Sequence, residues 1–74
     1  MQVDNLIRMA NQIGAFFEAM PNRPEALENL ALHIKKFWEP GMRSALLDHV
    51  DRAGDARLSR MAAEAIRLHR GRLR

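Results

Sequence analysis

The side chains best able to bind a metal ion or transfer a proton are three histidines, His33, His49 and His69, and the chain has no cysteine. A zinc site needs three or four ligands held close together, which on one helix means a spacing of three or four residues. The histidines are sixteen and twenty residues apart. This spacing predicts no metal site, and we expect each histidine to be an ordinary hydrogen-bonded or surface residue.

Side chains for covalent or acid–base catalysis are also sparse. Ser44 and Ser59 are the only hydroxyl side chains, because the chain has no Thr and no Tyr. A nucleophilic serine needs a base and an orienting acid, whereas Ser59 suits the cap of a helix. The four glycines are isolated, so no phosphate-binding loop is predicted. Glu25 and Glu28 lack the apolar surroundings of a catalytic acid. We therefore predict no catalytic, cofactor-binding or metal-binding residue, and a protein that is not an enzyme by itself.

Length and composition limit the remaining functions. A chain of 74 residues is expected to form a single domain over 1–74, and so small a core usually gains stability from disulfides, metals or partners. The lack of cysteine fits a reducing compartment. No apolar run reaches the length of a membrane span, and the first residues lack the features of a signal peptide. We predict a cytoplasmic protein without membrane contact.

Basic residues are concentrated in the last third of the chain. The net charge is only +3, yet seven of the twelve Lys and Arg residues lie there, namely Arg52, Arg57, Arg60, Arg67, Arg70, Arg72 and Arg74. Such a segment can neutralise phosphates or contact an acidic protein surface. A solvated helix end gives the same pattern, and nucleic-acid binders usually carry a basic stripe across the whole domain. Nucleic-acid binding is therefore an alternative and not the leading interpretation.

Apolar residues recur every three or four positions in the first half of the chain, which predicts helices. The first helix is expected over 4–20, with Asp4 as its cap. The second helix begins at a capping box formed by Asn22 and Glu25 and ends before Pro40. The short break between the two helices predicts an antiparallel hairpin.

The second half of the chain is expected to add one or two helices. Pro40 suits the first turn of a third helix that Gly54 ends. A fourth helix is predicted over 57–70, and its alanine-rich face is expected to bury little area. Gly14 in the first helix fits a close helix crossing. The predicted fold is all-α, a small bundle of three to four short helices.

The apolar surface exceeds what so short a chain can bury, which favours a protein-binding role. Phe17, Leu30 and Ile34 are expected in the core, and the only Trp lies at the corner before Pro40. We predict that Trp38 and Met42 fill an apolar pocket of a partner, with a nearby arginine bonded to a carboxylate or carbonyl at its rim. The predicted contact residues are Phe16, Leu32, Phe37, Trp38, Pro40, Met42 and Arg43.

Three blocks of sequence resemble a known family. The blocks are Val3 to Gly14, Phe16 to Pro21, and His33 to Pro40 followed by Met42-Arg43. In this order and spacing they resemble the delta subunit of soluble, molybdenum-containing NAD-dependent formate dehydrogenases over residues 3–50. Gly41 departs from the family, because many relatives have an arginine there. The positions that recur in the family are Asn5, Arg8, Met9, Asn11, Phe17, Phe37, Trp38, Pro40, Met42 and Arg43.

The resemblance implies a small cytoplasmic, non-catalytic subunit. Such a subunit attaches to the catalytic alpha subunit of formate dehydrogenase and supports assembly of the cofactor-loaded complex. The resemblance places the molybdenum bis-guanine-dinucleotide cofactor in the alpha subunit and none in this chain. Two alternatives remain open, a small basic nucleic-acid-binding protein and a self-associating helical bundle that forms a homodimer when isolated.

Overall fold

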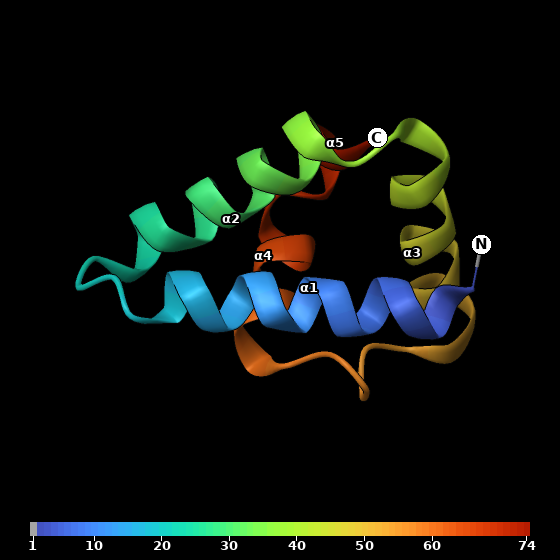
Figure 1. The fold of residues 1–74 in the computed structure, drawn as a ribbon, viewed down its shortest axis with the longest axis horizontal. Helices are drawn as coiled ribbons and strands as arrows, with labels where there is room; N and C mark the ends of the chain where they lie inside the picture. Colours follow the sequence, from blue (N-terminus) through green and yellow to red (C-terminus); the bar gives the residue numbers. More distant parts are fainter. Residues whose placement is uncertain (1) are drawn as a thin grey trace.

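The computed structural model describes residues 2–74, which form five helices joined by short segments (Figure 1). No strand occurs within this range, so the all-α prediction is confirmed. The helix predicted over 57–70 is shorter, and a separate one-turn helix follows it. The helices are α1 (Val3–Glu18), α2 (Arg23–Phe37), α3 (Pro40–Ala53), α4 (Arg60–Leu68) and α5 (Arg70–Leu73).

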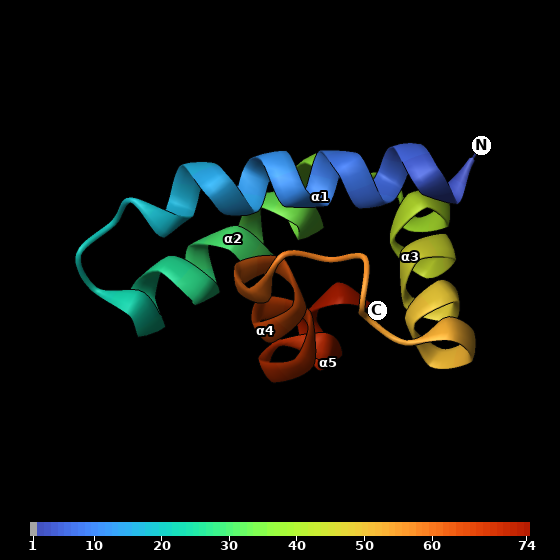
Figure 2. The ribbon, with the colours of Figure 1, turned by 90° about the horizontal axis from the view of Figure 1, so that it is seen from below.

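Helix α1 runs along the length of the molecule, and the other helices are arranged around it. Figures 1 and 2 show α2 returning from the far end of α1 at an incline to it, and α3 standing across the N-terminal end of α1. Helix α4 packs against both α1 and α2, and α5 packs against α2 and α4. The core therefore lies where α1, α2 and α4 meet, and α3 closes one end.

The caps follow the sequence prediction with one exception. The side chain of Asn22 accepts a hydrogen bond from the backbone N–H of Glu25 at 3.0 Å, as the capping box predicts. Helix α1 begins one residue earlier than expected, with Gln2 in the capping position. Asp4 therefore lies inside the first turn, where it pairs with Arg57 at 2.7 Å and makes no cap.

The turns after α2 and α3 and the break after α4 set the helix ends. Trp38 and Glu39 have extended backbones, and Pro40, which disfavours helical geometry in the residue before it, begins α3. Gly54 ends α3 with a φ of 84°, a conformation that favours glycine. His69 has a φ of −116° and a ψ of 26°, which is not helical, so α4 ends there.

Helix α4 lies in the centre of the fold. Its residues Met61, Ala62, Ala65 and Ile66 are at most 2% exposed. Small alanine side chains let α4 approach α1 and α2 closely, so that the larger side chains of those helices fill the space between them. This face of α4 is therefore fully covered, while the prediction that it buries little area concerns the area and not the exposed fraction, and it stays a prediction.

Gly14 lies where α1 crosses the start of α4. A Cβ atom at Gly14 would lie 3.2 Å from Ser59 Oγ and 3.6 Å from Ala62 Cβ. The same Ser59 hydroxyl accepts a hydrogen bond from the Ala62 N–H at 3.2 Å, which caps α4 as predicted. The close crossing inferred for Gly14 is confirmed, and a larger side chain there would disturb the cap.

We expect Gly14→Val to lower the free energy of unfolding by about 1–3 kcal/mol, because the added methyl groups overpack this crossing. Ala15→Val is the matched control, since Ala15 is adjacent and exposed. Helix propensity alone predicts that Gly14→Val is the more stable of the two variants, because Val is a better helix former than Gly and a worse one than Ala. Urea unfolding followed by circular dichroism measures both variants, and a Gly14→Val chain as stable as the parent would contradict the close crossing.

Candidate protein-interaction surface

The seven residues predicted to contact a partner do not form one surface. Trp38 lies in the core. The half-buried members are Met42, which packs against the core, and Arg43. The exposed members are Phe16, Leu32, Phe37 and Pro40. The structure thus separates the predicted set into residues that hold the fold and residues that face solvent.

Trp38 is only 4% exposed and belongs to the hydrophobic core. Helical geometry ends at Phe37, and the extended backbone at Trp38 turns the chain toward α3. The ring joins the same buried cluster as Ile34 of α2 and Leu46 of α3. The prediction that Trp38 fills a pocket on a partner is corrected, because its ring completes the chain's own core.

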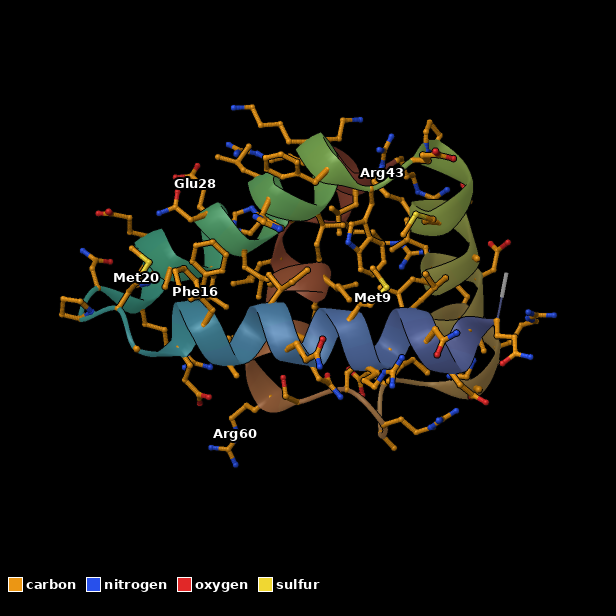
Figure 3. All side chains as sticks on the ribbon, in the orientation of Figure 1. Met9, Phe16, Met20, Glu28, Arg43 and Arg60 are labelled. Carbon is orange, nitrogen blue, oxygen red and sulfur yellow. The ribbon has the colours of Figure 1, made fainter. Side chains whose placement is uncertain are left out.

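Arg43 forms its hydrogen bonds within the chain. Its Nη1 donates to the carbonyl oxygens of Trp38 and Lys35 at 2.7 and 3.2 Å, and its Nε donates to the carbonyl of Leu73 at 3.0 Å. The first two carbonyls lie at the end of α2, where intrahelical donors are lacking and a cation is favourable. Arg43, labelled in Figure 3, therefore joins α2, α3 and the C-terminal segment. The expectation that Arg43 also bonds to a partner stays a prediction.

Aromatic side chains form a row across α1 and α2. The ring centroids are 5.2 Å apart for Phe16 and Phe17, 6.0 Å for Phe17 and His33, and 4.8 Å for His33 and Phe37. Phe16 is 73% exposed and Phe37 71% exposed, whereas the two inner rings are half-buried. Figure 3 shows Phe16 between α1 and α2, close to Met20. We call these four residues the aromatic row.

The aromatic row leaves apolar area that would gain free energy from burial. Fully burying a phenylalanine side chain is worth about 1.5–3 kcal/mol relative to leaving it in water. Neighbouring exposed apolar side chains are typical of protein contact sites, whereas single ones are common and need no function. Since Phe16 and Phe37 end one continuous row, this face is the best candidate for contact with another protein.

Other exposed apolar residues lie on different faces. Leu32 is 41% exposed, and it lies about 100° around α2 from His33. Leu68, near the end of α4, is 59% exposed, although the sequence pattern places it near the apolar side of its helix. Leu32 therefore remains an isolated exposed leucine, and it does not extend the aromatic row.

Phe17 and His33 are the members of the row that the sequence analysis misses. The apolar pattern of α1 places Phe17 in the core, and the wide spacing of the histidines gives His33 no metal-binding role. A signal was present, because His33 and Phe37 are four residues apart and so lie one turn apart on the same side of α2. The pairing of that side with Phe17 depends on how α1 and α2 cross, which the pattern does not specify.

Asn11 holds the segment between α3 and α4 against α1. Its Oδ1 accepts a hydrogen bond from the Ser59 N–H at 2.7 Å, and its Nδ2 donates to the Arg57 carbonyl at 3.1 Å. These bonds satisfy backbone groups of a segment without regular structure. They give Asn11 a structural role that only the family resemblance had indicated as important.

Ion pairs neutralise part of the arginine-rich end. They join Arg57 to Asp4, Arg70 to Asp51 and Arg72 to Glu28, at 2.7, 2.6 and 3.0 Å. Pairs with this much solvent contact each contribute about 0–1 kcal/mol to stability. Three of the seven arginines therefore face carboxylates, which weakens the case for a continuous basic stripe.

The described part of the chain offers no arrangement typical of catalysis or metal binding. Among residues 2–74 no three His, Asp or Glu side chains are placed to hold a metal ion. The same residues include no buried charged or polar side chain, the setting in which catalytic acids and bases are usually found. No helix in this range is both long and apolar enough to cross a membrane.

Comparison with protein families matches residues 5–66 to the NADH-dependent formate dehydrogenase delta subunit FdsD. The match covers most of the 74 residues and includes the whole aromatic row. The chain belongs to the FdsD family. This membership confirms the resemblance seen in the sequence. No curated protein and no solved structure matches the chain significantly. Helix α5 lies outside the FdsD match.

Trp38→Ala should lower the free energy of unfolding by about 3–5 kcal/mol, because it leaves a large cavity in the core. Phe37→Ala, at the adjacent exposed position, should change it by about 0.5 kcal/mol or less. Urea unfolding tests both variants. It is followed by circular dichroism and not by fluorescence, because the Trp38 variant has no tryptophan. Similar small losses in both variants would show that Trp38 is not part of the core.

Proposed function

We propose that this FdsD-family chain is a non-catalytic subunit that binds the catalytic alpha subunit of formate dehydrogenase and supports assembly or stability of the cofactor-loaded complex. The observation that carries the contact is the aromatic row, and the family carries the identity of the complex. In this proposal the protein is cytoplasmic. Formate is oxidised on the alpha subunit, which holds the molybdenum bis-guanine-dinucleotide cofactor, and this chain binds no cofactor.

The aromatic row has the properties of an interface centre. Phe16 and Phe37 present rigid rings with few rotatable bonds, so little side-chain entropy is lost on binding. Phe17 and His33 support them from half-buried positions, so the row is already ordered. The exposed Lys36, three residues from His33 on a neighbouring side of α2, supplies a charged group for the polar rim.

The size of the row favours a larger partner over a second copy of the chain. Two phenylalanine rings of about 150–250 Å² each, about 70% exposed, offer roughly 200–350 Å² in total. A stable interface of standard size buries about 800 Å² on each side. A symmetric dimer through the row alone is therefore too small. A groove on the alpha subunit can enclose the row together with the flanks of α1 and α2.

Support of assembly follows from binding linkage. A subunit that binds only the folded alpha subunit stabilises it by about 2.7 kcal/mol at a free concentration 100 times the dissociation constant. This gain is large relative to the total stability of a typical domain. The chain can therefore increase the amount of intact, cofactor-loaded enzyme without touching the cofactor.

Replacing both outer rings, Phe16→Ser and Phe37→Ser, should reduce retention of the chain on tagged alpha subunit at least about tenfold, as expected for interface hot spots. Leu68→Ser is the matched control, because Leu68 is similarly exposed on another face. Co-expression followed by pull-down measures retention, and circular dichroism verifies that all chains are folded. Undiminished retention of the double variant would rule out the row as the contact.

Formate oxidation should fall when the complex is expressed without this chain. Molybdenum and pterin contents of both preparations identify the reason. Lower cofactor content would assign the chain to assembly, whereas full cofactor in a dissociating complex would assign it to stability. Unchanged activity, cofactor content and subunit composition would contradict the proposed function.

A further inference from the structure

The last five residues, 70–74, form a strap that ties the C-terminal end to α2 and α3. Leu73 is only 2% exposed. The Leu73 carbonyl accepts a hydrogen bond from Arg43 Nε at 3.0 Å, and the Arg74 carbonyl accepts one from Lys35 Nζ at 2.9 Å. Figure 1 shows α5 beside the end of α2. One apolar anchor and two cationic donors therefore fix the strap's main chain.

Two ion pairs add to this attachment. Arg72 pairs with Glu28 of α2 at 3.0 Å, and Arg70 pairs with Asp51 of α3 at 2.6 Å. All four side chains keep between 30% and 52% of their area exposed. Ions in solution reach such pairs easily, so their strength falls as the salt concentration rises.

We propose that the strap is a releasable device, which opens about His69 while α1–α4 stay folded. Opening frees Lys35 Nζ of α2 and Arg43 Nε of α3, and it uncovers the corner where Trp38 is buried. Closing restores both. The proposal does not rest on the proposed binding to the alpha subunit, because every contact from which it is argued lies within this chain.

The contacts of the strap are few for the backbone that they order. Burial of one leucine, two hydrogen bonds from cationic side chains and two exposed ion pairs must offset the entropy lost in fixing five residues. Helix α5 is a single turn, too short to be stable by itself, and the exposed Gly71 weakens it further. A segment of this kind opens more readily than a packed core.

The ends of the strap also fit local opening. His69 already has a non-helical backbone, so rotation there breaks no turn of α4. The FdsD match ends at residue 66, before the strap begins. The matched region contains every buried residue of the core cluster except Leu73. The strap is therefore an addition at the edge of a core that is nearly complete without it.

Amide hydrogen exchange of the full chain, measured by NMR, tests the proposal. The Arg72 amide, which donates to the His69 carbonyl at 3.0 Å, should be at least about tenfold less protected than amides of α1 and α2. Its protection should fall further as NaCl is raised from about 0.01 to about 1 M, because the Debye length drops from about 30 to about 3 Å. Acrylamide quenching of Trp38, the only tryptophan, should rise in parallel while circular dichroism stays constant.

Leu73→Ala should lower the protection of the Arg72 amide about tenfold further, while the far-UV circular dichroism of the chain and the amide chemical shifts of α1 stay as in the parent chain. Leu68→Ala, the same substitution at an exposed position, should change none of these quantities. An Arg72 amide as well protected as the amides of α1 and α2 at every salt concentration would overturn the proposal. So would a Leu73→Ala chain that loses the helical circular dichroism and the native chemical shifts of α1 in the absence of urea, because the strap would then be part of the cooperative core.

Discussion

Burial of Trp38 at the turn between α2 and α3 is the interaction on which the rest of the structure depends. Pro40 makes the preceding backbone extended, and this geometry carries the indole ring into the core. Arg43 then bonds to the carbonyls of Lys35 and Trp38 at the end of α2. Ring and guanidinium together set the direction of α3, and the buried ring is not available to a partner.

This constraint determines which face can bind another protein. Because Trp38 turns inward, its neighbour Phe37 remains outside, where its ring packs against the ring of His33. Phe17 and Phe16 continue the row on α1. The same turn that completes the core of this FdsD-family chain therefore creates the exposed apolar face.

Local patterns predicted most of the fold. Apolar spacing gave the helical class, and Asn22, Ser59, Pro40 and Gly54 marked helix ends correctly, because caps and turns depend on neighbouring residues. Asp4 lies two residues after the observed cap Gln2, since an aspartate suits both the cap and the first turn of a helix. Residues with local roles were thus the ones that the sequence could place.

The candidate site was less predictable, because its members depend on distant parts of the chain. Helical periodicity puts Phe37 and Trp38 on the same side of α2. The helix ends between them, so Phe37 is exposed and Trp38 is buried. Arg43 bonds to carbonyls, which every residue possesses, so its partners have no sequence signature. Likewise, the contact of Ala62 in α4 with Gly14 in α1 depends on how the two helices cross, which neither residue specifies by itself.

The most direct test is amide hydrogen exchange of this chain, free and bound to the alpha subunit. The account predicts slower exchange on binding at residues 13–20 and 33–37, which carry the aromatic row, with little change in the middle of α4. Protection confined to the arginine-rich residues 52–74, with 13–20 and 33–37 unaffected, would contradict it.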